Sequence, residues 1–224
     1  MGPLASAELL ATLYRLNPTR REQDAPACAL LSDPSFPDRT TAIVDGDAAA
    51  LEELARRLEG AVRSLVTLGA GRVVIACFTV HRVLPELPPD LRARVVSLVD
   101  LVVEEVLADP RPRLLLATTG SREGRVFAGH PRWARVEPLV RWPDPADQEA
   151  LHEELYRLKR GEPPTETVPF VLGLERRYGV EGLVFGCTEL HLLHRHLAPE
   201  DAARVVDPLA TVARRFRRIV APSA

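Results

Sequence analysis

Two cysteines occupy similar surroundings far apart in the chain. Cys77 follows the apolar run 73–76, and Cys187 follows the run 183–186. A small residue precedes each cysteine, and a threonine follows closely. If both runs are parallel strands, the cysteines lie at strand ends, where open α/β sheets bind ligands and helix N-termini stabilise thiolates. The spacing predicts a paired functional site, and two simply buried thiols remain an equal alternative.

One basic residue differs from all the others. Lys159 is the only lysine among 29 basic residues, so the chain uses arginine for ordinary surface charge. A lysine provides a compact point charge on a flexible stem, which arginine does less well. Composition alone favours an ordinary helix surface residue over a functional one.

The elements that must position these residues alternate along the sequence. Helical spacing of apolar residues predicts helices over residues 5–16, 51–68, 91–107, 146–160, 166–177 and 208–219. Apolar runs predict strands over residues 28–31, 72–77, 113–117, 136–140, 183–185 and 204–206. This alternation is typical of parallel sheets covered by helices on both faces. Cys28 lies inside the first of these strands, and we expect it in the core.

Composition excludes several classes of protein. The 224 residues are 46% hydrophobic and 27% charged, which is ordinary for a globular protein and excludes a disordered one. A net charge of -2 gives no basic surface for nucleic acid. Acidic residues interrupt the longest apolar stretch, 95–107, so we expect no membrane span, and we see no signal peptide. Three cysteines argue against a disulfide scaffold and favour a cytoplasmic protein.

Five segments together resemble one known family. Ala76-Cys-Phe-Thr-Val-His81 and Gly186-Cys-Thr-Glu-Leu190 resemble the two cysteine motifs of the aspartate/glutamate racemase superfamily. Pro37-Asp-Arg-Thr40, Met1-Gly-Pro-Leu-Ala-Ser6 and Leu155-Tyr-Arg-Leu-Lys-Arg-Gly161 resemble segments of its aspartate racemase branch. The five segments occur in family order and span nearly the whole chain.

The resemblance implies an α/β fold of two Rossmann-like lobes with parallel sheets and an active site in the cleft between them. The loop 109–112 is the expected crossing, so residues 1–108 and 205–224 would form one lobe and residues 109–204 the other. The implied activity is a racemase or epimerase that needs no cofactor and no metal. Cys77 and Cys187 would exchange the α-proton on opposite faces of the substrate, and thiols suit this work because their pKa is tunable toward neutrality.

The resemblance also implies the residues that bind substrate. Arg39 and Lys159 match positions that hold the side-chain carboxylate, which makes an acidic, aspartate-like substrate the expectation. The residues matching the family's carboxylate-binding turns are Thr79, Thr118, Thr119, Ser121 and Thr188. Glu189 is interpreted as orienting the substrate ammonium group or Cys187, with helix capping as the alternative. The expected partner is therefore a small carboxylic or amino acid, and a homodimer is left open.

Departures from the family pattern keep two other functions open. Phe78 stands where the family usually has asparagine, a polar contact to substrate. An isomerase, cyclase or decarboxylase acting on a less polar acid is therefore the second hypothesis, and a non-catalytic ligand-binding homologue is the third. His191 replaces a common proline, and we interpret His191, His194 and His196 as a solvated helix face rather than a metal site. His81 is expected either to tune Cys77 or to pack beneath its turn.

The amino end departs from the pattern as well. Met1-Gly-Pro3 resembles a loop that follows a central strand in this family, and the given sequence has no residues before it. We expect either a natural chain that starts upstream, which we favour, or another segment that fills the strand position. Under the favoured reading, the 224-residue form is poorly stable or inactive.

Overall fold

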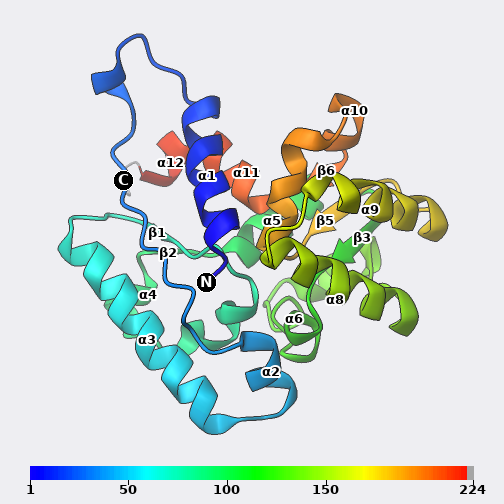
Figure 1. Cartoon of the computed structure of the whole chain (residues 1–224), viewed down its shortest axis with the longest axis horizontal. Helices are drawn as coiled ribbons and strands as arrows, with labels where there is room; N and C mark the ends of the chain where they lie inside the picture. Colours follow the sequence, from blue (N-terminus) through cyan, green and yellow to red (C-terminus); the bar gives the residue numbers. More distant parts are fainter. Residues whose placement is uncertain (221–224) are drawn as a thin grey trace.

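A computed structural model describes residues 1–220 and has two parallel sheets within them (Figure 1). The larger sheet has the order β4-β3-β5-β6, and the smaller sheet pairs β1 with β2. The strands are β1 (Val73–Val74), β2 (Val95–Val96), β3 (Arg113–Leu116), β4 (Val140–Arg141), β5 (Leu183–Phe185) and β6 (Val205–Val206). Every pairing is parallel, so the predicted α/β class is confirmed.

Helices cover these sheets. The longer helices are α1 (Pro3–Leu16), α3 (Ala48–Thr67), α5 (Leu98–Ala108), α8 (Pro145–Lys159) and α9 (Pro164–Tyr178). The shorter helices are α2 (Arg39–Val44), α4 (Pro89–Arg92), α6 (Thr119–Glu123), α7 (Trp133–Val136), α10 (Pro199–Ala202), α11 (Pro208–Arg214) and α12 (Phe216–Val220). The 3₁₀ helices are η1 (Glu22–Asp24), η2 (Thr79–Glu86), η3 (Glu137–Leu139) and η4 (Thr188–His196). Figure 1 shows α1 and α11, from opposite ends of the chain, side by side.

The larger sheet is buried on both faces, which explains its unbroken apolar strands. Leu114 and Leu116 of β3 pack into a core that includes residues of α8 and α9. Leu115 points to the opposite face and packs into a core that includes residues of α5. Leu116 is paired with Phe185, so the turns after β3 and β5 leave the same edge of the sheet side by side.

The smaller sheet carries the first cysteine turn. Leu58 and Val62 of the amphipathic helix α3 pack in one core with Val73, Ile75 and Cys77. Helix α3 begins after Asp47, whose carboxylate accepts a hydrogen bond from the Ala50 backbone N–H and so caps the helix. The packing of α3 against β1 and the residues that follow this strand therefore fixes the position of Cys77.

Several predicted elements were wrong in detail. The predicted helix 91–107 is split by β2 because Ser97 caps a new helix, α5. The predicted strand 136–140 is mostly helical and contributes only Val140 to β4. The last predicted helix is divided into α11 and α12.

The predicted strand 28–31 does not form. Its residues belong to no helix or strand and are exposed, and Cys28 is exposed rather than part of the core. An apolar run becomes a strand only where a neighbouring strand pairs with it, and no strand of the described residues does so here.

The division into lobes stays a prediction. Strand β6 pairs with β5 in the larger sheet, although the predicted boundary after residue 204 assigns it to the first lobe. Helix α11, which follows β6, packs against both α1 and α5. Within residues 1–220, no helix is long and apolar enough to span a membrane.

Candidate active site

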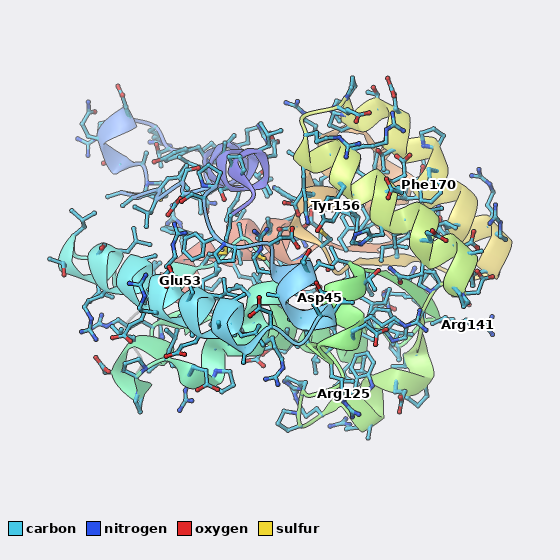
Figure 2. All side chains as sticks on the ribbon, turned by 60° about the horizontal axis from the view of Figure 1, so that its bottom comes forward. Asp45, Glu53, Arg125, Arg141, Tyr156 and Phe170 are labelled. Carbon is cyan, nitrogen blue, oxygen red and sulfur yellow. The ribbon has the colours of Figure 1, made fainter. Side chains whose placement is uncertain are left out.

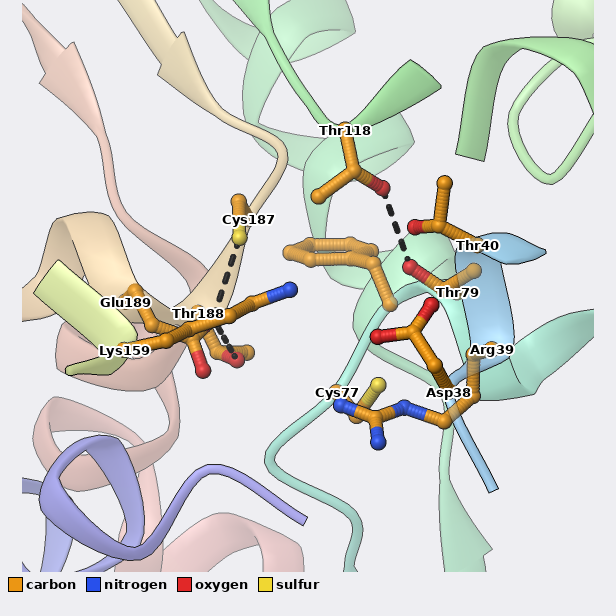
Figure 3. Close-up of a pocket in the computed structure, with 11 residues that line it drawn as sticks. Asp38, Arg39, Thr40, Cys77, Thr79, Thr118, Lys159, Cys187, Thr188 and Glu189 are labelled. Carbon is orange, nitrogen blue, oxygen red and sulfur yellow. Dashed lines mark hydrogen bonds between the residues drawn. The ribbon is translucent and has the colours of Figure 1, made fainter. Parts of the chain in front are cut away.

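One small pocket collects residues from both sheets (Figure 3). It is lined by Asp38, Arg39, Thr40, Cys77, Phe78, Thr79, Thr118, Lys159, Cys187, Thr188 and Glu189. Both predicted catalytic cysteines are in this lining, one at the end of β1 and the other at the end of β5. The free volume of about 10 Å³ holds no more than about one water molecule.

The Cys187 thiol is buried and paired with a carboxylate. Its Sγ donates a hydrogen bond to Glu189 Oε2 over 3.0 Å. Burial raises the pKa of Cys187 well above its ordinary value, and the negative charge of Glu189 raises it further, while Lys159 opposes the shift. Thr188 Oγ1 donates to the Ala76 carbonyl over 3.1 Å, which ties the second cysteine turn to the first.

Glu189 lies against the start of α1. A Cβ at Gly2 would collide with Glu189 Oε1, so a larger residue there would require the Glu189 side chain to move. Gly2 is the residue immediately before the first turn of α1, where the helix dipole favours a negative charge. Glu189 is itself buried. The Glu189 side chain thus lies between the start of α1 and the Cys187 thiol, from which it accepts a hydrogen bond.

The Cys77 turn is braced from beneath by a histidine. The Leu98 backbone N–H donates to His81 Nε2 over 3.2 Å, so the ring proton must be on Nδ1. His81 Nδ1 then donates to the Cys77 carbonyl over 2.9 Å. Burial lowers the pKa of His81 to about 4, so the ring is neutral near pH 7. His81 contacts the backbone of the turn, and this observation favours the packing interpretation.

Arg39 reaches the first cysteine from the start of α2. Asp38 caps this helix by accepting from the Thr41 N–H over 2.9 Å, and Arg39 is the first helical residue. Burial lowers the pKa of Arg39, but the nearby Cys77, Asp38 and Glu189 outweigh burial and raise it. The guanidinium therefore remains a fixed positive charge beside the Cys77 thiol (Figure 3).

Lys159 supplies a second positive charge from the end of α8. Its Nζ lies 4.0 Å from the centre of the Tyr156 ring, a cation–π contact that holds the side chain in place. Burial lowers the pKa of Lys159, but Cys187, Glu189 and other neighbours raise it overall. The only lysine of the sequence thus lies in the pocket, facing the second cysteine.

A contact between α8 and α2 closes one side of the pocket. Tyr156 on α8 donates its hydroxyl hydrogen to Asp38 Oδ2 over 2.9 Å. Figure 2 shows Tyr156 next to the short helix that precedes Asp45. On the same side, a Cβ at Gly120 of α6 would collide with the backbone of Thr40. Helix α2 and the residue that caps it therefore pack tightly against α6 and α8, two helices that follow strands of the larger sheet.

Three hydroxyl groups meet at the other side of the pocket. Thr79 Oγ1 lies 3.1 Å from Thr118 Oγ1 and 3.0 Å from Ser121 Oγ, and the last two atoms are 3.0 Å apart. Thr79 and Thr118 line the pocket, whereas Ser121 supports them from behind. Thr119, another predicted binding residue, is not part of the lining. The structure therefore brings together nine of the eleven predicted site residues in one pocket.

Phe78 combines two roles that the sequence left open. Only 2% of its surface is exposed, and its ring packs 5.1 Å from the ring of Phe127. The same side chain also lines the pocket. Phe78 is thus a core residue whose ring forms part of the pocket wall.

The interpretation of His191 as a solvated residue was wrong. Only 1% of this residue is exposed. His191 Nδ1 lies 2.6 Å from Asp207 Oδ2, and Nε2 lies 3.0 Å from Thr12 Oγ1. The ring therefore joins η4 to α11 and α1. No cluster of potential metal ligands occurs among residues 1–220.

Three further residues belong to the site and were missed. Asp38 and Thr40 line the pocket, and Tyr156 supports both Asp38 and Lys159. Asp38 and Thr40 flank Arg39 within a segment that carried the family resemblance, so the signal was present. Tyr156 precedes Lys159 by one helical turn, which is the spacing at which side chains on a helix meet.

Comparison with known proteins places this arrangement in a family. The sequence model described as Asp/Glu/Hydantoin racemase matches residues 1–216. The chain belongs to this racemase family. The racemase resemblance noted from the sequence motifs is therefore confirmed over nearly the full length.

Solved structures of similar proteins agree at the level of the fold. An aspartate racemase from Picrophilus torridus matches with a TM-score of 0.77 and 20% identity, over 97% of this chain and 94% of that chain. An aspartate racemase homologue from Pyrococcus horikoshii OT3 matches with a TM-score of 0.64 and 20% identity, over the same shares of 97% and 94%. These likenesses show that the racemase fold extends across the chain.

Proposed function

We propose that this racemase family member interconverts the two enantiomers of an acidic amino acid, with Cys77 and Cys187 as its two acid–base groups. The observation that carries the proposal is the shared pocket: two thiols from two sheets line one space together with two cations. A protein that only binds a ligand needs no pair of thiols, so this pairing argues for catalysis.

The surroundings of the two thiols suggest their resting forms. Arg39 places a positive charge beside Cys77, which suits a group that accepts a proton. Cys187 donates its hydrogen to Glu189 and is therefore a thiol. In this form Cys77 removes the α-proton from one face of the substrate, and Cys187 delivers a proton to the opposite face.

The proton balance of the reaction is simple. The C–H bond breaks toward the Cys77 sulfur, and its electron pair remains on the α-carbon beside the carboxylate. A new C–H bond forms with the Cys187 proton. Cys77 ends as a thiol and Cys187 as a thiolate. The protein can then act on the opposite enantiomer, as a reversible racemisation requires. Lys159, close to Cys187, would stabilise that second thiolate.

The charges and hydroxyls of the pocket suggest how the substrate binds. The hydroxyls of Thr79 and Thr118 can donate to the α-carboxylate, where negative charge develops during proton removal. Arg39 and Lys159 offer a fork and a point charge for a second carboxylate. Two half-buried cations in so small a pocket favour a dicarboxylic substrate of the aspartate type.

Phe78 supports a second candidate function. Its ring forms part of the pocket wall and offers no hydrogen bond, which favours a less polar carboxylic acid. An isomerase, cyclase or decarboxylase reaction would use the same thiols on such a substrate.

Proton exchange separates these functions. We would incubate D- and L-amino acids with the protein in deuterium oxide and follow the α-proton by NMR and the enantiomer ratio by chiral chromatography. Exchange with racemisation of aspartate or glutamate supports the proposal. Turnover without racemisation supports the second candidate, and binding with neither argues against catalysis.

Serine variants test the two-thiol mechanism. Cys77→Ser and Cys187→Ser should each lower racemisation by about 10²–10⁴-fold, because a hydroxyl is a poorer base than a thiolate. Cys28→Ser is the matched control, because Cys28 is exposed and lies outside the pocket. Near-normal racemisation by either pocket variant would rule the mechanism out.

A further inference from the structure

One buried cross-link close to the second cysteine plays no part in the proton transfer proposed above. Cys187 is the residue before η4, and His191 lies within that helix. His191 is 1% exposed and has a partner at both ring nitrogens, Asp207 Oδ2 at 2.6 Å and Thr12 Oγ1 at 3.0 Å. The proline common at this position in the family has no polar side-chain atom and could make neither contact. This chain therefore holds η4 by a contact of its own.

The first anchor of His191 is a fixed carboxylate. Asp207 caps α11, because its Oδ1 accepts hydrogen bonds from the Leu209 N–H over 3.0 Å and the Ala210 N–H over 3.2 Å. Burial raises the pKa of Asp207, but His191 and the hydrogen bonds outweigh burial and lower it overall. An ionised carboxylate can only accept hydrogen bonds, so His191 Nδ1 is the donor. This bond ties η4 to the first turn of α11.

The second anchor lies on α1. Thr12 is 5% exposed, and its Oγ1 also accepts a hydrogen bond from Arg15 Nη2 over 2.8 Å. Arg15 in turn pairs with Glu8 on the same helix. The threonine hydroxyl is thus braced by its own helix where it meets His191. A contact between two buried side chains that are each held in place fixes the position of η4 along α1.

The same two helices meet a second time, next to the thiol. Glu189 of η4 lies so close to Gly2 that a Cβ there would collide with Oε1, while Oε2 accepts the hydrogen bond from Cys187 Sγ over 3.0 Å. Gly2 and Thr12 are separated by about 15 Å along the helix axis, at 1.5 Å per residue. Figure 3 shows Glu189 beside Cys187. α1 therefore touches η4 at two separated points, one at His191 and one at Glu189.

Two separated contacts fix the orientation of one helix against another, whereas a single contact leaves the helix free to pivot. Loss of the contact at His191 would therefore be felt at Glu189. The hydrogen bond from the Cys187 sulfur depends steeply on distance and angle, so a displacement of about 1 Å is enough to weaken it. The buried cross-link and the thiol are coupled in this way although they do not touch.

We propose that His191 is a positioning residue for the second thiol: by joining η4 to α11 and α1, it holds Glu189 against Cys187. His191 is not among the residues that line the pocket. The inference rests on the proposed function, because it concerns the group that delivers the proton in that reaction. It adds to that function a residue that controls the proton affinity of Cys187 from outside the pocket.

The charged neighbours of the two residues determine how a variant is interpreted. Glu189 from η4 and Lys159 from α8 act on the Cys187 thiol. Asp207 is bonded to His191, and the ring of His194 stacks on the His191 ring with the two centres 6.0 Å apart. A substitution at His191 leaves both charges at Cys187 in the chain. A change in the pKa of Cys187 would then report a displaced carboxylate and not a deleted one.

The experiment measures both pocket thiols in the full chain without substrate. Alkylation of Cys187 and Cys77 by iodoacetamide is followed from pH 6 to pH 10 by peptide mass spectrometry, so that Cys77 is an internal reference. The midpoint of each pH profile reports the pKa of the thiol, whereas the plateau at high pH reports its accessibility.

Three variants remove the cross-link to different extents. His191→Leu removes both contacts, whereas Thr12→Val removes only the contact to α1. His191→Asn keeps an amide donor for Asp207. The matched control is Thr211→Val, at a fully buried threonine of α11 whose hydroxyl accepts a hydrogen bond from Arg214.

His191→Leu should shift the Cys187 profile to lower pH, because a displaced Glu189 raises the pKa less, and alkylation at pH 8 should be about fivefold faster. Thr12→Val and His191→Asn should shift it in the same direction, by about twofold. Thr211→Val should shift neither profile. Added to Glu189→Gln, the His191→Leu change should cause no further shift, because its effect passes through the carboxylate.

Three outcomes would overturn the proposal. An unchanged or upward-shifted Cys187 midpoint in the His191 and Thr12 variants would show that the cross-link only stabilises the fold. Equal shifts at Cys77 and Cys187 would show that the whole pocket loosens. Additive effects in the double variant would show that His191 does not act through Glu189.

The design remains decisive in two further respects. If His191→Leu does not fold, Thr12→Val alone and combined with Glu189→Gln carries the same test, since it removes a single hydroxyl with little change of shape. The alkylation profiles need no substrate, so they can fail while racemisation is intact. An absence of racemisation with the expected profiles would instead contradict the proposed function alone.

Discussion

The sulfur of Cys187 donates a hydrogen bond to Glu189 Oε2 over 3.0 Å, and no such carboxylate partner is recorded for the Cys77 sulfur among the described residues. Arg39 lies beside Cys77 instead. The two thiols of one pocket thus differ in their surroundings, because Cys187 contacts a carboxylate with Lys159 as an opposing charge, whereas Cys77 has Arg39 beside it. This asymmetry supports the roles proposed for the two residues, in which Cys77 accepts the α-proton and Cys187 delivers one.

Glu189→Gln should make Cys187 more reactive. The pKa of Cys187 is raised by burial and then by the charge of Glu189, so removing that charge should lower it. At pH 8, alkylation of Cys187 by iodoacetamide should become about tenfold faster. Peptide mass spectrometry would measure Cys187 and Cys77 separately in one sample.

The control for this prediction is Glu162→Gln, at a residue outside the pocket that pairs with Arg157 and Arg160. It should leave both alkylation rates unchanged. Slower alkylation of Cys187 in Glu189→Gln would mean that the carboxylate promotes the thiolate, which contradicts the assignment of Cys187 as the resting thiol.

Much of the site was predictable because its signals are local. An apolar run, a small residue and a cysteine place Cys77 and Cys187 at strand ends, and the structure brings both to one pocket. Composition marked Lys159 as the only lysine but favoured an ordinary surface residue, and the family resemblance was needed to assign it to the site. Such features depend on a few neighbouring residues, which is why the sequence displays them.

The predictions that were wrong have a different cause. They concern residues whose structure depends on contacts with residues far away in the sequence. His191 is buried by Asp207 and Thr12, which are 16 and 179 residues away in the sequence. Segment 28–31 has the composition of a strand but no neighbour to pair with in the described chain. Strand β2 has only two residues. The alternation of apolar and polar residues that marks a strand cannot be recognised over so short a stretch between two helices.

Arg39→Met and Lys159→Met should weaken binding of a dicarboxylic substrate. Loss of one charged partner from a buried ion pair costs roughly 2 kcal/mol or more, which corresponds to a rise in KM of about 30-fold. Steady-state kinetics with aspartate would measure this rise. Arg56→Met is a suitable control because Arg56 lies on the surface of α3, where it pairs with Glu53.

A monocarboxylic substrate such as alanine provides the second comparison. If both cations hold a distal carboxylate, their removal should change KM for aspartate far more than any residual turnover of alanine. Equal losses for both substrates would show that these residues bind the α-carboxylate or act on the thiols instead.

His81 should make stability depend on pH below neutrality. Its pKa is lowered to about 4 in the folded protein, from an ordinary value near 6.5. Between these values the unfolded chain binds the proton and the folded protein does not, so this contribution is present above pH 6.5 and is lost as pH falls toward 4. From pH 7.5 to pH 5, His81 should account for about 2 kcal/mol of lost unfolding free energy.

Urea unfolding at both pH values would measure this contribution in the wild type and in His81→Gln. The glutamine variant should be less stable at pH 7.5, because it loses the contacts to Cys77 O and Leu98 N. It should also lose less stability on acidification. An identical pH dependence in both proteins would show that His81 does not carry this proton linkage.

Phe78→Asn should separate the two functions proposed for the pocket. The ring is 2% exposed and packs against Phe127, so truncation should lower the unfolding free energy by roughly 3 kcal/mol. If the ring also limits the polarity of the pocket, the ratio of kcat/KM for aspartate to that for a less polar acid should rise.

Phe78→Leu is the matched variant, because it opens a cavity without adding a hydrogen-bonding group. A rise in the ratio with asparagine but not with leucine would assign substrate selection to Phe78, whereas equal changes in both would reduce its role to packing.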